Sequence, residues 1–338
     1  MRLLHCLSTH ELAGTERHVA GLTEALSADH DVTLLLERDT HDPATGADIA
    51  DILRPGPRVL RAGRKGYAAG LASLLLRERF DIIHTHLGRA SARARLLRPL
   101  RGRAKLVATL HNAYRPRAYA GHDALICIAH WQSSAIPSRI PHRVIGNWLN
   151  PVPMLSRQEA RAVLGIAEHD FILVAAGRFV PEKGFASLLR AFAAASRADP
   201  RLADSRLFLF GDGPERPALT QLASPGVTFM GFRPDLRRLL PAFDGFVLPS
   251  RREPFGLVLL EAMAADLPIL ATRAGGVTDI LDDRTAILVP PEDDDALMHG
   301  LLRLREAQPR AYDLSSFMRE RKIRETVQFY AELTGPAP

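Results

Sequence analysis

The stretch that organises the predicted fold is residues 244–276, DGFVLPSRREPFGLVLLEAMAADLPILATRAGG. Its first apolar run ends at Ser250 and has the length and composition of a buried strand, and a second such run ends just before Gly275. Between the two runs a short loop holds Glu253, and a helix begins at Gly256. Strand, helix and strand in this order form the basic unit of a parallel sheet.

The loop of this unit lies where a ligand is expected. In open parallel sheets ligands bind at the carboxyl ends of the strands, which here means beside Glu253, Phe255 and Gly256. The helix that begins there offers free backbone N–H groups and a positive dipole end, which suit a phosphate. Glu261 follows Glu253 by eight residues, and at about 100° per helical residue the two carboxylates return near one face. Such a pair is suited to accept hydrogen bonds from sugar hydroxyls, although a single Glu in either place is more often a solvated surface residue.

A second loop brings two cations to the carboxyl end of another strand. Residues 171–177 form an uninterrupted apolar strand, and the next loop carries Arg178 and Lys183 before a helix from about Phe185 to Ser196. Both side chains can point at one anion from such a strand-to-helix loop. The Walker pattern G-x-x-x-x-G-K-[ST] is absent, so this is not the phosphate loop of P-loop NTPases.

Together the two loops resemble the two donor-site signatures of glycosyltransferase family 4. One signature runs from Glu253 to Glu261 as Glu, any residue, Phe, Gly, four apolar residues and Glu. The other runs from Gly177 to Gly184 as Gly-Arg, four residues and Lys-Gly. The resemblance implies the GT-B fold, in which two Rossmann-like, doubly wound parallel-sheet domains face a central cleft. It also implies a retaining hexosyltransferase whose donor is a nucleotide-diphosphate sugar, here expected to be a UDP-sugar.

The same resemblance assigns roles to individual residues. Arg178 and Lys183 are expected to clamp the donor diphosphate, while Glu253 holds the sugar hydroxyls. Glu261 holds the ribose hydroxyls, and the segment beginning at Gly231 contacts the base, mostly through backbone atoms. The expected catalytic residues are Glu253, His111, Arg178 and Lys183. The expected donor-binding residues are Gly14, Arg178, Lys183, Gly231, Phe232, Phe255, Gly256, Leu257 and Glu261.

The first 150 residues alternate short apolar runs with helical patterns, which predicts another parallel, doubly wound sheet. The chain opens with a strand, a loop that contains Gly14 and a helix from about Glu16 to Ser27. No complete G-x-G-x-x-G is present, so no dinucleotide is inferred. The loop keeps one glycine and the Glu-Arg pair of the family 4 loop that faces the acceptor and the donor sugar. The expected strands are residues 2–7, 31–37, 58–62, 81–86, 105–111 and 124–129.

Three histidines lie at or near the ends of these strands, where ligands collect. We interpret His84 and His86 as buried, hydrogen-bonded core residues, which is the more common role of a histidine in such a place. His111 is singled out because residues 109–112, TLHN, resemble the family position whose histidine reaches the donor sugar. The D-x-D of residues 29–31 lies between a helix and the start of a strand, so we interpret it as a turn and not as a metal site.

Two prolines, Pro151 and Pro153, interrupt the regular pattern and indicate a domain boundary near them. The expected organisation is an acceptor-side domain of residues 1–150 and a nucleotide-sugar-binding domain of residues 151–312. Residues 313–338 are expected to form a C-terminal helix, from about Asp313 to Leu333, that crosses back to the first domain.

Composition is typical of a globular protein in a reducing compartment. Of the 338 residues 46% are hydrophobic and 24% charged, and no apolar run approaches the ~18 residues of a membrane helix. The two cysteines have no metal-ligand spacing, and the first residues lack the apolar core of a signal peptide. A cytoplasmic location is therefore expected.

Positive charge is concentrated in the first half of the chain. Residues 1–150 carry 21 Lys and Arg against 13 Asp and Glu, the remainder carries 23 against 25, and residues 87–105 contain no acid. One interpretation is peripheral contact with the anionic inner face of the cytoplasmic membrane, and the other is a solvated basic face. Nucleic acid is not an expected partner, because no aromatic residues are interleaved with these arginines.

We therefore predict a glycosyltransferase that acts on a saccharide or lipid-linked saccharide in cell-surface polysaccharide or lipopolysaccharide synthesis. No cofactor or metal is expected, since Arg178, Lys183 and the helix amides before Leu257 would stabilise charge on the leaving phosphate. Two alternatives stay open: a nucleotide-sugar epimerase or phosphorylase on the same architecture, and a non-catalytic nucleotide-sugar-binding partner of a membrane glycan complex. Net transfer to an acceptor distinguishes them.

Overall fold

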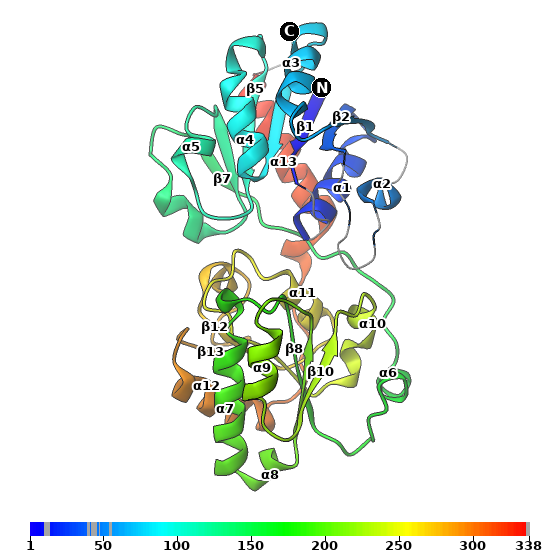
Figure 1. The fold of residues 1–338 in the computed structure, drawn as a ribbon, viewed down its shortest axis with the longest axis vertical. Helices are drawn as coiled ribbons and strands as arrows, with labels where there is room; N and C mark the ends of the chain where they lie inside the picture. The colour runs from blue at the N-terminus through cyan, green and yellow to red at the C-terminus, as the bar shows by residue number, and fades with distance from the viewer. Residues whose placement is uncertain (10–13, 39–40, 42–45, 47, 54–55, 336–338) are drawn as a thin grey trace. The chain divides into compact units, whose positions relative to one another are not determined.

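The part of the chain that the computed structural model describes is residues 1–9, 14–38, 41, 46, 48–53 and 56–335. It divides into two compact units (Figure 1). The first unit contains residues 1–147 together with the chain from residue 319 onward, and the second contains residues 148–318. Each unit has a sheet whose paired strands run parallel, with helices packed against it.

The sheet of the first unit has seven strands in the order β3-β2-β1-β4-β5-β6-β7. The order reverses between β1 and β4, which is the kind of switch point at which doubly wound sheets bind ligands. Most of the strands are rich in Val, Ile and Leu, as expected for strands that are covered on both faces. They are β1 (Arg2–Leu7), β2 (Asp31–Glu37), β3 (Arg58–Ala62), β4 (Ile82–His86), β5 (Lys105–Leu110), β6 (Ala124–Cys127) and β7 (His142–Val144).

Helices cover both faces of this sheet. They are α1 (Gly14–Leu26), α2 (Ile49–Ile52), α3 (Tyr67–Arg77), α4 (Leu87–Leu96), α5 (Pro116–Tyr119) and α13 (Arg319–Thr334). Because alternate strand residues point to opposite faces, Leu4 and Ile83 pack in one buried cluster with residues of α3 and α4. Leu7 and Leu34 belong to a second cluster with residues of α1 and α2.

The last helix, α13, packs within the first unit. Tyr330 is fully buried and its hydroxyl shares a hydrogen bond with His84 of β4. At the start of the helix, Nη2 of Arg319 donates to the carbonyl of Gly21 at 2.7 Å. A short 3-10 turn at Ser315–Phe317 comes first, so the regular helix begins at Arg319 and not at residue 313.

The sheet of the second unit has six strands in the order β10-β9-β8-β11-β12-β13. Its order reverses between β8 and β11, which are hydrogen-bonded neighbours. The strands are β8 (Ile172–Ala176), β9 (Arg206–Phe210), β10 (Val227–Gly231), β11 (Gly245–Leu248), β12 (Ile269–Thr272) and β13 (Ile287–Val289).

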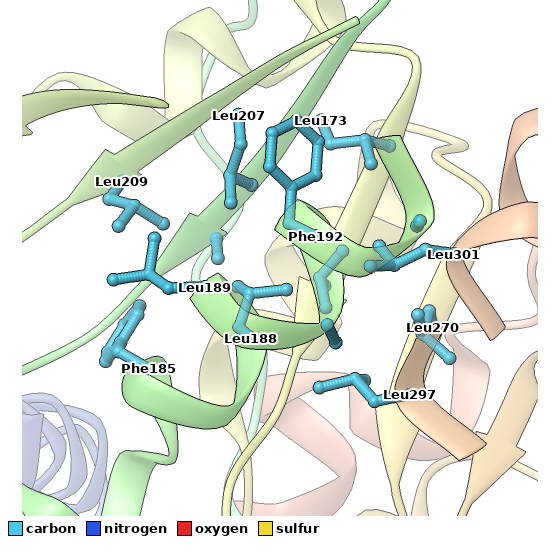
Figure 2. Close-up of a cluster of buried hydrophobic side chains, with 14 of the residues drawn as sticks. Leu173, Phe185, Leu188, Leu189, Phe192, Leu207, Leu209, Leu270, Leu297 and Leu301 are labelled. Carbon is cyan, nitrogen blue, oxygen red and sulfur yellow. The ribbon is translucent and has the colours of Figure 1, made fainter. Parts of the chain in front are cut away.

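One face of this second sheet is closed by a large apolar core around α7 (Figure 2). Leu188, Leu189 and Phe192 of α7 lie in this cluster with Leu207 and Leu209 of β9, and all five are fully buried. Fully burying side chains of this size stabilises a fold by about 1.5–3 kcal/mol each. The helices of the unit are α6 (Arg157–Leu164), α7 (Phe185–Ala198), α8 (Pro200–Ala203), α9 (Arg216–Leu222), α10 (Leu236–Leu239), α11 (Leu257–Ala264) and α12 (Asp294–Glu306).

The two parallel sheets confirm the predicted fold class of two doubly wound α/β folds. Strands β1, β2 and β3 have the predicted bounds, and the other strands that were predicted agree to within a few residues. The D-x-D of residues 29–31 lies at a turn that ends where β2 begins, as predicted.

Candidate active site

In the second unit, loops at the carboxyl ends of β8, β9 and β11 pack backbone against backbone. A Cβ added at Gly184, after β8, would lie 2.0 Å from the carbonyl oxygen of Pro249, after β11. A Cβ at Gly211, after β9, would lie 1.9 Å from the carbonyl oxygen of Gly177. Both glycines also have positive φ angles, which L side chains rarely adopt. Glycine at these two positions therefore lets the three loops form one continuous surface.

On this surface Lys183 and Glu253 form an ion pair. Nζ of Lys183 lies 2.6 Å from Oε2 of Glu253, and the hydroxyl of Ser250 donates to the same oxygen at 3.1 Å. The Glu253 side chain is only 6% exposed, whereas that of Lys183 is 25% exposed. The carbonyl of Glu182 accepts the N–H groups of Arg251 and Arg252, which ties the β8 loop to the β11 loop. The pair is thus held by backbone on both sides.

The loop after β12 fixes the other side of the Glu253 loop. Gly276 N–H donates to the carbonyl of Glu253 at 2.9 Å, and a Cβ at Gly276 would lie 2.7 Å from Cα of Phe255. The ring of Phe255 is buried and meets Phe317 edge to face, with 6.4 Å between ring centroids. Phe255, predicted as a donor-binding residue, therefore packs its ring into the unit and helps to hold the loop in place.

Helix α11 begins immediately after this loop. Gly256 is its N-cap, with φ of 105°, and no side chain caps the helix. The N–H of Leu259 is taken by the carbonyl of Gly256, as in an ordinary first turn. Uncapped N–H groups at the start of a helix, with the positive end of the dipole, are suited to an anion. The predicted helix start at Gly256 and Leu257 agrees with the structure.

Glu261 lies in a different setting from Glu253. Its Oε1 is 3.6 Å from Nε of Arg237 on α10, and it lines a cavity of about 360 Å³. Burial raises the pKa of Glu261 to about 7, while Arg237 opposes the rise. The prediction that Glu253 and Glu261 share a helical face is wrong, because residues 251–256 are not helical. The cavity is lined by Leu149, Asn150, Pro151, Val152, Met154, Arg237, Glu261, Ala264 and Leu314.

Three other predicted donor residues lie at the ends of β8 and β10. Arg178 is exposed at the end of β8, where its carbonyl accepts the N–H of Val180 at 2.9 Å. Gly231 ends β10 with φ of 70°, and its carbonyl accepts the N–H of Gly211, which joins the ends of β9 and β10. Phe232 follows with its ring 53% exposed, an unusual position for a phenyl group and one suited to stacking on a planar ligand.

In the first unit the predicted residue His111 follows β5 and is buried. Its Nε2 is 3.3 Å from Nδ1 of His86, and Nε2 of His86 is 3.1 Å from Nδ1 of His5. Burial lowers the pKa of His5 and of His111 to about 3, so both rings are neutral at physiological pH. His84 and His86 are fully buried and hydrogen-bonded, as predicted.

Three of these histidines also have the spacing of a metal site. One ring nitrogen from each of His5, His84 and His86 lies within 4.8 Å of the others. Both ring nitrogens of His84 already have partners, however, namely the hydroxyls of Tyr330 and Thr109. Gly14 is the exposed first residue of α1, and the preceding residues 10–13 of the predicted loop lie outside the described residues.

Sequence reasoning missed Ser250, Arg237 and His5 as members of these sites. Ser250 and Arg237 belong to no motif, and their roles depend on contacts made only in the folded chain. A signal for His5 was present, because it lies on the strand that pairs with β4, directly opposite His84. A register prediction for β1 and β4 would have brought the two imidazoles together.

The basic stretch of residues 87–105 finds several of its acidic partners elsewhere in the fold. Arg93 pairs with the buried carboxylate of Glu37 at 3.1 Å, and Arg101 forms a two-pronged pair with Asp123. These pairs neutralise part of the charge that the sequence concentrates there. Among the described residues, no helix combines the length and the apolar character needed to cross a membrane.

Comparison with known proteins matches each unit to a glycosyltransferase family model. Residues 12–150 match the family described as "Glycosyltransferase Family 4", and residues 170–307 match "Glycosyl transferases group 1". The lipopolysaccharide core biosynthesis glycosyltransferase LpsD of Rhizobium meliloti is 32% identical over 56% of this chain. The N-acetyl-alpha-D-glucosaminyl L-malate synthase of Bacillus anthracis is 30% identical over 63% of this chain. These alignments span 55% and 62% of the relatives' own lengths, less than two thirds of either.

Solved structures support the same fold. The Anabaena protein Alr3699/HepE in complex with UDP aligns over 98% of this chain and 100% of its own, with a TM-score of 0.78 and 19% identity. The same protein has also been solved in complex with UDP-glucose. At this identity the likeness concerns the fold alone, and it is the GT-B fold expected from the two signatures. With residues 12–150 matched to family 4 and residues 170–307 to the group 1 glycosyl transferases, the chain is a family 4-like glycosyltransferase.

Proposed function

We propose that this protein is a retaining glycosyltransferase that moves a hexosyl unit from a nucleotide-diphosphate sugar to a saccharide acceptor. The observation that carries the proposal is the Lys183–Glu253 pair. It joins the loops after two neighbouring parallel strands, β8 and β11, beside the uncapped start of α11. A cation, a carboxylate and free helix amides in one place suit a ligand that is part diphosphate and part sugar.

In this proposal the cations and the carboxylate separate when the donor binds. Lys183 and Arg178 turn to the diphosphate, and the amides at the start of α11 bind the same group. Glu253 then accepts hydrogen bonds from the sugar hydroxyls, and Glu261 from the ribose. Phe232 offers an exposed ring to the base. We assign the donor as a UDP-sugar because a structural neighbour of the same fold binds UDP and UDP-glucose.

The chemistry follows from where charge develops. As the bond between the anomeric carbon and the phosphate oxygen breaks, negative charge moves onto the diphosphate, where Arg178, Lys183 and the α11 amides stabilise it. The acceptor hydroxyl attacks the anomeric carbon from the leaving-group side, and the departing phosphate oxygen takes its proton. A new carbon–oxygen bond forms with the configuration retained. The charge is balanced by protein groups, so the proposal includes no metal and no cofactor.

The proposed role of His111, in the first unit, is to donate a hydrogen bond to the sugar. Because burial holds its pKa near 3, the ring is neutral and cannot act as a cationic acid at physiological pH. A neutral imidazole still has one N–H to donate. Its role is therefore to orient the sugar.

The proposed acceptor is a saccharide in lipopolysaccharide or cell-surface polysaccharide synthesis. The support is the similarity to LpsD, together with the net positive charge of the first 150 residues. Peripheral contact with an anionic membrane would bring a lipid-linked acceptor to the enzyme. Vesicles of phosphatidylglycerol and phosphatidylethanolamine test this contact: the protein should sediment with them, and Arg98→Glu with Arg103→Glu, both exposed positions, should weaken sedimentation. Equal sedimentation of the wild type and the double variant would contradict membrane contact through these arginines.

The activity is tested with a panel of UDP-, GDP- and ADP-sugars and truncated lipopolysaccharide cores as acceptors, in the presence of EDTA. Release of one nucleoside diphosphate together with a glycosylated acceptor is expected from the wild type and not from Glu253→Ala or Lys183→Ala. Interconversion of the free nucleotide sugar would identify an epimerase instead. Donor binding without any turnover would identify a non-catalytic partner.

A further inference from the structure

Three imidazoles in the first unit form a continuous hydrogen-bonded chain. His5 Nδ1 is 3.1 Å from His86 Nε2, and His86 Nδ1 is 3.3 Å from His111 Nε2. The residues come from β1, from β4 and from the end of β5, so they follow three neighbouring strands across the switch point of the sheet. The chain ends at His111, the residue to which the proposed function gives a contact with the sugar.

The end of the imidazole chain at His5 determines which ring nitrogens carry protons. Nε2 of His5 is buried and has no hydrogen-bond partner among the described residues. A buried N–H without a partner is rarer in proteins than an unpaired acceptor, so Nε2 is the bare nitrogen and the proton of His5 is on Nδ1. The Nδ1–H of His5 then donates to His86 Nε2. That leaves the proton of His86 on Nδ1, from which it donates to His111 Nε2.

We propose that His86 is a positioning residue that, supported by His5, holds His111 as the tautomer protonated on Nδ1. The Nε2 lone pair of His111 is occupied by His86, and no described residue accepts a hydrogen bond from Nδ1. His111 therefore presents a single N–H donor, suited to a hydroxyl oxygen of the sugar, and cannot take a proton from the acceptor. The sugar contact rests on the proposed function, whereas the tautomer is a property of the ligand-free protein.

A metal ion is the competing explanation for the unpaired nitrogen of His5. It would require His84 as a third ligand, and both nitrogens of His84 are hydrogen-bonded, to the hydroxyl of Tyr330 and at 2.8 Å to that of Thr109. Metal binding would break at least one of these two buried hydrogen bonds and also the hydrogen bonds between the imidazoles. Each such bond is worth about 0.5–1.5 kcal/mol. The hydrogen-bonded chain keeps all of them.

Long-range ¹H–¹⁵N correlation of ¹⁵N-histidine-labelled protein at pH 7.5 tests the proposal directly, because the ¹⁵N shifts identify the protonated ring nitrogen. We expect the Nδ1–H form for His111, assigned with His111→Gln. In His86→Leu the signal should become a mixture of tautomers, while His86→Asn, whose amide can donate from near the Nδ1 position, should restore the Nδ1–H form. His122→Gln changes a buried histidine outside the chain and should leave His111 unaltered.

Two results would overturn the proposal: an Nε2–H form of His111 in the wild type, or a stoichiometric shift of the His5, His84 and His86 signals on adding Zn²⁺. Activity adds an independent readout. His86→Leu should lower kcat by about tenfold, the value of one hydrogen bond, and His86→Asn should recover most of it. If the protein transfers no sugar at all, the proposed function fails while the tautomer measurement still decides the role of His86.

Discussion

Lys183 and Glu253 are seventy residues apart in the chain, and their side chains meet at 2.6 Å across the loops after two adjacent strands. Ser250 donates to the same carboxylate oxygen, and the backbone of Glu182 accepts from Arg251 and Arg252 beside it. The pair is therefore part of the folded scaffold before any ligand arrives. In the proposed function the donor replaces this contact, with Lys183 turning to the diphosphate and Glu253 to the sugar, while the two loops stay fixed by their backbone contacts.

Replacing either member of this pair should strongly reduce transfer while leaving the fold intact. We expect Lys183→Ala and Glu253→Gln each to lower kcat/KM by at least about a hundredfold, because each removes a group that stabilises charge in the transition state. Arg190→Ala provides the control. It breaks another ion pair of the same unit, between Arg190 of α7 and Asp294 of α12, on the surface. Steady-state kinetics would contradict the assignment if the Arg190 variant lost as much activity as the other two.

Gly184 should not tolerate a side chain. Its φ is 68°, and a Cβ would lie 2.0 Å from the carbonyl of Pro249, so Gly184→Ala must push the β8 loop away from the β11 loop. Gly165 has nearly the same φ of 64° but has nothing within 4 Å of the added atom. We expect Gly165→Ala to cost about 1 kcal/mol of unfolding free energy and Gly184→Ala clearly more. Urea unfolding of the two variants measures the difference, and equal losses would show that the loop contact is unimportant.

Glu261 should make stability depend on pH in a particular direction. Its folded-state pKa is raised to about 7 from an ordinary value of 4.5, so the folded protein holds this proton where the unfolded chain has released it. Stability is then lost as pH rises from about 4.5 to 7, and no further above that. Glu261→Gln should remove the loss and stabilise the protein by roughly 1–3 kcal/mol at pH 8. Urea unfolding at pH 8 and at pH 5 measures the gain, which should shrink at the lower pH; the exposed Glu168→Gln serves as control.

The buried histidines predict the opposite dependence for the first unit. The pKa values of His5, His84, His86 and His111 are all lowered by burial, so the unfolded chain takes up protons that the folded unit does not. Stability is complete above about pH 6.5 and falls as pH decreases, by up to roughly 1.4 kcal/mol per pH unit for each histidine. Hydrogen exchange of peptides from β4 and from β9, followed through urea titrations at pH 7.5 and at pH 5.0, gives an unfolding midpoint for each unit. The midpoint should fall more for β4 than for β9 between the two pH values. Equal losses would contradict this prediction.

The fold could be predicted from the sequence because its strands are short apolar runs bounded by glycine, proline and charged residues. Residues 2–7, 31–37 and 58–62 are examples in which pattern and structure coincide. The loops of Lys183 and Glu253 were singled out because their spacing matches a family pattern, and the structure brings the two side chains together. Helix α13 was placed less well: it begins at Arg319, after a separate 3-10 turn at Ser315–Phe317.

Contacts between distant residues could not be predicted in this way. Nothing local indicates that Arg93 will meet Glu37 or that Tyr330 will meet His84, 246 residues earlier in the chain. The prediction that Glu253 and Glu261 share a helical face assumed that both are on the helix, and only Glu261 is. The acid-free run of residues 87–105 was interpreted as a basic surface because its partners lie far away in sequence.

The most direct test of the account is a transfer reaction with UDP-[1-¹³C]glucose and a truncated lipopolysaccharide core, followed by NMR of the labelled anomeric carbon. We predict that the wild type forms an acceptor glycoside with the same anomeric configuration as the donor, in EDTA, and that Glu253→Gln forms none. If no sugar in the donor panel gives such a product, or if the product has the inverted configuration, the Lys183–Glu253 pair is not the centre of a retaining glycosyltransferase.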